Sequence, residues 1–161
     1  FSKQSSQRVI EPSPFHPAEV ARALVWNFGA KFKQMSANAY NFPLTVEIYA
    51  IGQSYFDDRK YVLLDRQTTT FTPTKENGRS HAFKSERRVE LLSFNMHDQA
   101  YGHRYKTYLV TVKDMRGDII QYETPNNWLF EHLGKLDNIG IGHYFDQACN
   151  RVFPTGPKRY Y

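Results

Sequence analysis

Two alternating segments, 104–113 and 118–124, flank a four-residue turn, and this arrangement constrains the fold more than any other part of the sequence. The turn is Asp114-Met115-Arg116-Gly117. Aspartate at its start and glycine at its end are typical of a type I turn followed by a left-handed glycine, which makes a three-residue hairpin loop with a bulge. We therefore expect an antiparallel hairpin here.

The turn also sets an expected register for the hairpin. Asp114 pairs with Asp118, and Val112 pairs with Ile120. Because side chains alternate between the two faces of a strand, this register places one apolar set on a single buried face. The set is Val110, Val112, Ile120 and Tyr122.

Three other segments share the period of two, namely residues 44–51, 61–71 and 89–96. Residues 139–145 are a candidate last strand, and residues 124–136 a candidate short helix. Aromatic residues, which favour strands, make up 16% of the chain. Successive short strands without long helices between them predict an antiparallel sheet or sandwich and argue against parallel βαβ units.

Residues 17–35 are predicted to form an amphipathic helix, because Pro17 suits a first helical turn and one face is apolar at 100° per residue. That face holds Val20, Ala21, Leu24, Val25, Phe28, Phe32 and Met35. Trp26 falls on the opposite side with Arg22 and Lys33. An exposed tryptophan flanked by cations is typical of an interface anchor, although a helix buried on two sides would explain it as well.

The strand-rich part, residues 44–145, resembles immunoglobulin-like and fibronectin-III-like β-sandwich domains of exported bacterial proteins. The resemblance rests on the hairpin patterning, since the cysteine pair and core tryptophan pattern of antibody domains is absent. It implies a mainly β (α+β) fold: an antiparallel, immunoglobulin-like β-sandwich with an N-terminal amphipathic helix and one short helix near the C-terminus. It implies no functional residue.

Length and composition predict one domain with two short extensions. Residues 1–16 are expected to be a flexible, polar and proline-rich leader, residues 17–155 a single β-sandwich domain, and residues 156–161 a basic aromatic tail. A Ser/Gln-rich start without methionine suggests that a signal peptide or anchor preceded it, although a trimmed chain looks the same. We therefore expect an extracytoplasmic location, in the periplasm or at the cell surface. No run of 18 apolar residues could span a membrane as a helix.

The net charge of +5 favours anionic partners, although solubility alone also explains it. Residues 75–88 form a basic loop with a net charge of +3. Its cations are Lys75, Arg79, Lys84, Arg87 and Arg88. Basic residues interleaved with Phe83 and His81 could contact an anionic polysaccharide; nucleic acid is not expected as a partner.

The hairpin tip carries the tripeptide Arg116-Gly117-Asp118, which some integrins recognise. The tip would expose a cation and an anion on either side of the glycine. The turn by itself explains all three residues. Arg116 and Asp118 are therefore candidate binding residues with a structural alternative.

Known catalytic patterns are absent: the sequence holds no Gly-x-Ser-x-Gly elbow, no His-Glu-x-x-His and no phosphate-binding glycine loop. Cys149 is the only cysteine, which excludes an intrachain disulfide and a cysteine-based zinc site. His97, Asp98 and His103 share one loop where a metal could bind, but surface histidines explain them more simply. We expect no catalytic residue, no cofactor and no metal.

These observations predict a non-catalytic, exported binding or assembly domain whose partner is a protein or a second copy, such as a pilus-associated or anchored surface subunit. A carbohydrate- or polyanion-binding module is the first alternative, and a small enzyme is the second. An exposed strand edge would favour assembly. A coplanar aromatic pair over a shallow groove would favour the module. Titratable groups converging in a deep pocket would favour the enzyme. The module would use aromatic residues at strand ends and loops, namely Tyr55, Phe56, Tyr101 and Tyr105.

Overall fold

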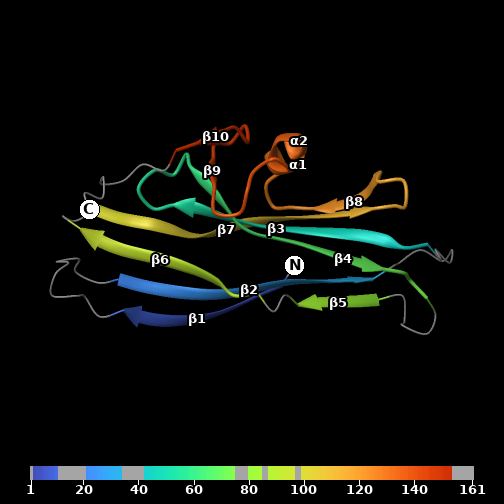
Figure 1. Cartoon of the computed structure of the whole chain (residues 1–161), viewed down its shortest axis with the longest axis horizontal. Helices are drawn as coiled ribbons and strands as arrows, with labels where there is room; N and C mark the ends of the chain where they lie inside the picture. The colour runs from blue at the N-terminus through green and yellow to red at the C-terminus, as the bar shows by residue number, and fades with distance from the viewer. Residues whose placement is uncertain are drawn as a thin grey trace.

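A computed structural model describes residues 2–10, 21–33, 42–74, 80–84, 87–96 and 99–153, and most of these form antiparallel strands (Figure 1). The strands are β1 (Ser2–Ile10), β2 (Ala21–Lys33), β3 (Leu44–Ser54), β4 (Tyr61–Phe71), β5 (Ser80–Lys84), β6 (Val89–Met96), β7 (Gln99–Lys113), β8 (Ile119–Glu123), β9 (Tyr144–Phe145) and β10 (Arg151–Val152). Two short helices follow β8, α1 (Trp128–Glu131) and α2 (Leu133–Leu136).

The strands form two antiparallel sheets that share β7. The start of β7 pairs with β6 in the sheet that also holds β1, β2 and β5. The rest of β7 pairs with β3 on one side and β8 on the other, and β3 continues to β4, β9 and β10. Figure 1 shows β1, β2 and β5 in a lower layer and the two helices on the far side of the upper sheet. The predicted mainly antiparallel β fold is confirmed, whereas the immunoglobulin-like sandwich is not.

The core between the two sheets consists of apolar side chains that alternate along each strand. Val46, Ile48 and Ala50 of β3 point to the same face, because residues two apart in a strand share a side. They belong to two adjoining clusters with Phe28 and Ala30 of β2. The other buried members are Val62, Leu64, Val89, Leu91 and Val110.

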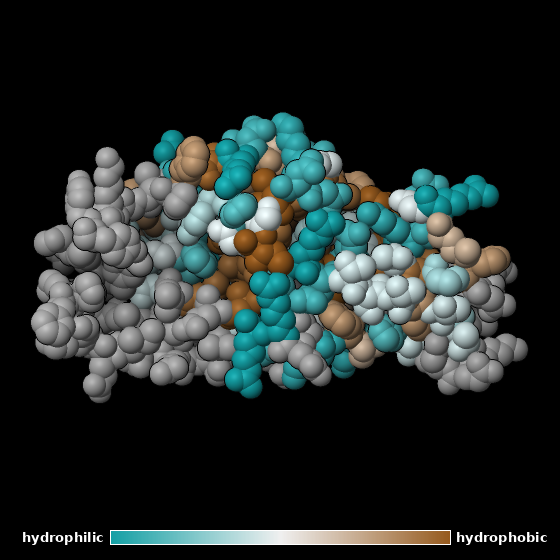
Figure 2. Space-filling model, viewed as in Figure 1, coloured by the Kyte–Doolittle hydropathy of each residue, from teal (hydrophilic) through white to brown (hydrophobic). Residues whose placement is uncertain are grey.

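A second core lies on the opposite face of β3, under the C-terminal helices. Tyr49 and Ile51 contribute to it from β3, and Leu129 and Leu136 cover them from the helices. Leu63, Leu109, Ile139, Phe145 and Cys149 complete it. On the face shown in Figure 2, hydrophobic side chains are visible between hydrophilic ones over the middle of the molecule.

The predicted helix over 17–35 is wrong for Ala21–Lys33, which form β2; its remaining residues lie outside the described part of the chain. Leu24, Phe28 and Phe32 are four residues apart, so they share a face in a helix and equally in a strand. Trp26 and Ala30 distinguish the two, because they join that face only in a strand. Asn27 and Gly29, both poor helix formers, count against the helix.

The N-terminal residues 2–10, expected to be part of a flexible leader, form β1 and pair along their whole length with β2. Residues 11–16 and the tail, 156–161, lie outside the described residues. The predicted short helix near the C-terminus is confirmed as the pair α1 and α2. Neither of these helices is long and apolar enough to cross a membrane.

The hairpin of β7 and β8 is confirmed, with the left-handed glycine at its turn: Gly117 has φ +84° and donates its N–H to the Asp114 carbonyl at 3.1 Å. The expected pairing of Asp114 with Asp118 is present, with the Asp114 N–H donating to the Asp118 carbonyl at 2.9 Å, but farther from the turn the register differs from the expected one by one residue. Val112 pairs with Gln121, because a bulge follows the pair of Lys113 and Ile119. As a consequence Ile120 and Tyr122 are exposed, and only Val110 of the predicted apolar set is fully buried.

Substituting Gly117 tests the turn. A Cβ there would meet no atom within 4 Å, so any destabilisation comes from the positive φ alone. We expect Gly117→Ala to lower the free energy of unfolding by about 1 kcal/mol in urea denaturation. Gly134→Ala is the matched control, because Gly134 has equal space, lies in α2 and has no positive φ. An equal loss in both variants would contradict the strain argument.

Candidate functional site

The loop between β3 and β4, residues 55–60, is held in one conformation by hydrogen bonds at both ends. The Ser54 N–H donates to the Lys60 carbonyl at 3.0 Å, and the Tyr55 N–H donates to the Gly102 carbonyl at 2.9 Å. The Ser54 hydroxyl accepts the N–H groups of Phe56 and Asp57, each at 3.2 Å. The side-chain amide of Gln53 donates to the Asp58 carbonyl at 2.8 Å. A loop fixed in this way can present side chains without ordering them on binding.

An ion pair crosses the tip of this loop. The Arg59 guanidinium donates to both carboxylate oxygens of Asp57, Nε to Oδ1 at 3.0 Å and Nη2 to Oδ2 at 3.1 Å. The Arg59 backbone N–H donates to Oδ1 as well. These hydrogen bonds from Arg59 hold the pKa of Asp57 below its ordinary value. The pair therefore presents a fixed arrangement of donors and acceptors to the solvent.

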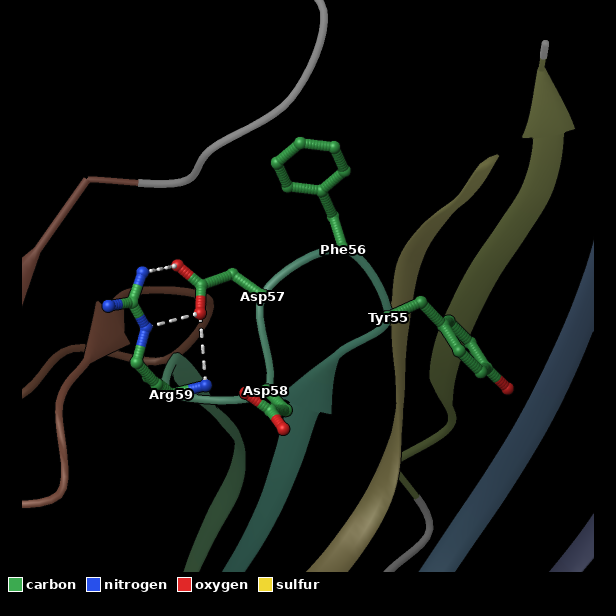
Figure 3. A pocket seen from close by; sticks show the side chains of 5 residues that line it. All are labelled: Tyr55, Phe56, Asp57, Asp58 and Arg59. Carbon is green, nitrogen blue, oxygen red and sulfur yellow. Dashed lines mark hydrogen bonds and ion pairs between the residues drawn. The ribbon is translucent and has the colours of Figure 1, made fainter. Parts of the chain in front are cut away.

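Two aromatic side chains lie next to the ion pair and are exposed, Tyr55 by 38% and Phe56 by 41%. One face of Phe56 stacks on Tyr101 of β7, with ring centres 5.2 Å apart and planes 11° apart. The Arg104 guanidinium lies 5.7 Å from the Tyr55 ring. Figure 3 shows Tyr55 and Phe56 pointing in different directions, away from the Asp57–Arg59 pair. Phe56 and Tyr101 thus stack on each other and do not form a side-by-side platform.

Two shallow, open hollows meet at this loop and share Asp58 and Arg59. The first, of about 500 Å³, is formed by residues 55–59 (Figure 3). The second, of about 530 Å³, extends toward the C-terminal segment. Its lining is Gln53, Asp58, Arg59, Tyr61, Asp146, Gln147 and Ala148. Together the two linings hold three carboxylates and one guanidinium, so their charge does not favour a polyanion.

Sequence reasoning named Tyr55 and Phe56 only as loop aromatics and missed the fixed loop around them. A signal for that loop is present in the order Ser54…Asp57…Arg59. Serine and aspartate side chains commonly accept backbone N–H groups two or three residues ahead in turns. The contribution of Asp146 and Gln147 could not be read from the sequence, because it depends on where the C-terminal segment folds back.

Trp26, predicted to lie outside the core, lies on the same side of β2 as Phe28, with ring centres 6.0 Å apart and planes 4° apart. It also packs against Tyr105 at 5.3 Å, and its half-buried ring borders the core between the sheets. The Lys3 ammonium lies 4.1 Å from the centre of the Tyr105 ring. Trp26 and Phe28 share a side because they are two residues apart in a strand, whereas a helix would place them on different sides. A partner-binding role for Trp26 stays a prediction.

The other predicted cations do not gather at one place that the structure describes. Lys75 and Arg79 lie outside the described residues, and Arg22 and Lys33 are placed only by their backbones in β2. Lys84 and Arg88 are exposed. Arg116 and Asp118 are exposed at the hairpin turn, where the backbone N–H of each donates to the Asp114 carboxylate. Their recognition by an integrin stays untested.

Arg87 has a structural role that the sequence did not indicate. Its Nη1 lies 3.5 Å from Oδ1 of Asp65, a carboxylate only 1% exposed, and its carbonyl accepts the side-chain amide of Asn27 at 3.2 Å. The Gln67 amide donates to both oxygens of Asp65. Arg87 therefore links β4 to β2, and binding a ligand would compete with this ion pair.

Titratable groups converge at a second place, under α2. The Tyr49 hydroxyl lies 2.5 Å from Oε2 of Glu47 and 2.5 Å from Oδ1 of Asp137. Arg66 Nη2 lies within 3.4 Å of both carboxylates, and Lys113 Nζ lies 3.3 Å from Oε1 of Glu47. One hydroxyl proton serves two carboxylates, and two cations offset their charge. These residues line neither of the two hollows described above.

Two further groups bear on catalysis and metal binding. Burial raises the pKa of the Cys149 thiol to about 11, which keeps it protonated and unreactive at neutral pH. His103 Nδ1 lies 3.1 Å from the Tyr144 hydroxyl, and burial lowers the pKa of His103. His97 and Asp98 lie outside the described residues. Within the described part of the chain, no three side chains of the metal-ligating types cluster.

Comparisons with protein-family models, with curated proteins and with solved structures find no match to this chain.

The Tyr49 cluster predicts a dependence of stability on pH at both extremes. Burial and the hydrogen bonds to Asp137 and Glu47 raise the pKa of Tyr49, so its stabilising effect is lost as the pH rises above about 10, its unfolded value. Burial works to raise the pKa of Glu47, but the bonds from Tyr49 and Lys113 and the charge of Arg66 outweigh it, and the net shift is downward. The stabilising effect of Glu47 is therefore lost as the pH falls below about 4.5.

We expect Tyr49→Phe to lower the free energy of unfolding at neutral pH by about 1–3 kcal/mol, because the two carboxylates lose the hydroxyl proton between them and keep only Arg66 and Lys113 as partners. It should also remove part of the loss at high pH in chemical denaturation series. Tyr122→Phe, at an exposed tyrosine of β8, is the control and should change neither. A Tyr49→Phe variant with the wild-type pH profile would show that the cluster does not titrate as described.

The link between Arg87 and Asp65 gives a second prediction. We expect Arg87→Ala to lower the free energy of unfolding by about 1–3 kcal/mol, because a buried carboxylate loses its cation, partly offset by Gln67. Arg88→Ala, which removes the neighbouring exposed cation, should change it by less than about 0.5 kcal/mol in the same urea titration. If both substitutions lower the free energy of unfolding by the same small amount, Arg87 contributes no more to stability than an exposed cation does.

Proposed function

We propose that this chain is a non-catalytic binding domain and that its ligand site is the β3–β4 loop with the two hollows beside it. The observation that carries the proposal is the combination of exposed aromatic rings with an ordered polar surface on one hydrogen-bonded loop. The hollows are open and shallow, which suits a ligand that lies across the surface.

The chemistry of the loop favours a neutral saccharide. The free face of Phe56 can pack against the C–H face of a sugar ring, as aromatic side chains combine a large apolar surface with little entropy cost. The Asp57–Arg59 pair and Asp58 offer acceptors and donors for hydroxyl groups. Carboxylates outnumber the cation here, and this supports an uncharged ligand over the anionic polysaccharide considered for the basic loop.

The cellular setting of this function is part of the proposal. An exported domain in the periplasm or at the cell surface, pilus-associated or anchored, would meet saccharides of the envelope or of another cell. Assembly with a protein partner is a second function, and the outer side of β8 favours it, because no second strand of the described residues pairs there.

Binding can be measured by NMR chemical-shift changes on titration with soluble oligosaccharides of glucose, xylose, mannose and N-acetylglucosamine, with heparin as the anionic probe. We expect amide shifts confined to residues 53–60 and 146–148 with a neutral saccharide. Phe56→Ala should weaken the affinity about ten-fold through loss of stacking.

Met115→Ala, which removes an exposed apolar side chain at the hairpin turn, at the opposite end of β7 from the loop, is the matched control and should leave the affinity unchanged. Preferential binding of heparin, or neutral binding that survives Phe56→Ala, would contradict the proposed site. The absence of shifts with every probe would contradict the saccharide class.

A further inference from the structure

Arg104 of β7 lines neither hollow beside the β3–β4 loop, yet it contacts one lining residue of each. Its Nη2 donates to Oε1 of Gln53 at 3.1 Å, and Gln53 belongs to the second hollow. Its guanidinium also lies 5.7 Å from the ring centre of Tyr55, which belongs to the first hollow. A cation at such a distance is attracted to the ring. Arg104 therefore supports both hollows from outside.

The sheet determines where Arg104 meets Gln53. Gln53 of β3 pairs with Arg104 of β7 on one side and with Tyr61 of β4 on the other. Residues that lie opposite each other in neighbouring strands point to the same face of the sheet. The three side chains therefore form a row across the sheet, and the row ends at Tyr61 in the lining of the second hollow.

The Gln53 side chain transmits this contact to the loop. Gln53 is only 6% exposed, and both ends of its amide are bonded: Oε1 accepts from Arg104, and Nε2 donates to the Asp58 carbonyl at 2.8 Å. Turning the amide over would place its NH2 group against the guanidinium and its oxygen against the carbonyl, which pairs donor with donor and acceptor with acceptor. Arg104 thus fixes the orientation in which Gln53 holds the backbone of Asp58.

Asp58 and Arg59 form the wall that the two hollows share. The hollows measure about 500 and 530 Å³, and each volume is in the range of small-molecule sites. Their linings differ in chemistry. The first holds the free face of Phe56 (Figure 3), whereas the second holds the polar groups of Asp146 and Gln147. A chain of linked sugar units suits this division, because one unit can stack while the next makes hydrogen bonds.

We propose that the ligand is an oligosaccharide whose linked units occupy both hollows, and that Arg104 is the positioning residue that holds the shared wall between them. This inference rests on the proposed function and specifies the ligand of that site. Once one unit is bound, the next reaches its own hollow at a high effective concentration. That gain requires a fixed geometry between the two hollows, which the contacts from Arg104 through Gln53 to Asp58 provide.

The stacking part of the site does not depend on Arg104. The Phe56 ring stacks on Tyr101 with ring centres 5.2 Å apart, and the Phe56 N–H donates to the Ser54 hydroxyl. A short saccharide that only stacks on Phe56 should therefore bind equally well without the Arg104 guanidinium. The length of the probe thus separates the contribution of Phe56 from that of Arg104.

The dependence of affinity on chain length tests the proposal. NMR titrations would use glucose, xylose, mannose and N-acetylglucosamine, each from the monosaccharide to the hexasaccharide. For the sugar that binds, we expect the affinity of the unaltered protein to rise at least about ten-fold along the series. Arg104→Ala should leave the monosaccharide affinity within about two-fold and reduce the rise to less than about three-fold. Arg104→Lys, which keeps a donor for the Gln53 oxygen, should keep most of the rise.

Two further variants separate positioning from charge and from direct contact. Lys106→Ala removes another exposed cation of β7, two residues from Arg104, and should change no affinity. The double variant Arg104→Ala with Gln53→Leu should lose no more of the rise than Gln53→Leu alone, because Arg104 acts through the Gln53 amide. In the protein without ligand, Arg104→Ala should shift the backbone amide resonances of Asp58 and leave those of the hairpin at Gly117 unchanged.

A rise with chain length that survives Arg104→Ala, or losses that add in the double variant, would overturn the role of Arg104. Equal affinity for every length would overturn the oligosaccharide as ligand and would still leave a saccharide site at Phe56. The absence of binding by every probe would contradict the proposed function itself, so the two failures give different results.

Discussion

The fold depends on strand β3 being buried on both of its faces. From Val46 to Ser54 every residue of this strand is shielded from solvent. The even-numbered residues of the segment Val46–Ile51 pack toward the lower sheet, and its odd-numbered residues pack toward the C-terminal helices. Burial on both faces explains the continuous apolar run Ile48–Ile51, because a strand covered on two sides does not need the alternation of apolar and polar residues found in a half-exposed strand. Removing either cover would expose half of this core.

Polar groups connect the layers where the apolar cores end. Arg87, bound to β2 of the lower sheet through Asn27, reaches Asp65 of β4 in the upper sheet, and Tyr49 connects β3 to Asp137 beyond α2. Each of these bonds involves a group with little solvent exposure, so each fixes the relative position of two segments more than it adds net stability. These contacts also restrict the β3–β4 loop, because the loop begins at the end of the buried strand β3.

The sequence predicted the elements whose signals are local. The hairpin at Gly117 and the alternating strands follow from turn chemistry and periodicity, and both are present. The helix predicted over 17–35 was wrong because the spacing of Leu24, Phe28 and Phe32 fits both the helical period of 3.6 residues and the strand period of two. Trp26 and Ala30, which fit only the strand period, were given too little weight. The predicted hairpin register was wrong because the bulge in β8 depends on β7 pairing with β3 and β8 at the same time, which local sequence does not show. The loop site was not predictable as a unit, since its two halves, at Asp57 and Asp146, are far apart in the chain.

The sharing of β7 by both sheets has a consequence for how the molecule opens. In a sandwich of two separate sheets, one layer can detach while the other stays intact. Here the 15-residue β7 contributes its first residues to one ladder and its last residues to the other, so neither layer can separate without breaking a continuous strand. The two layers should behave as a single cooperative unit, in which the amides of β7 become accessible to solvent only when the whole domain unfolds.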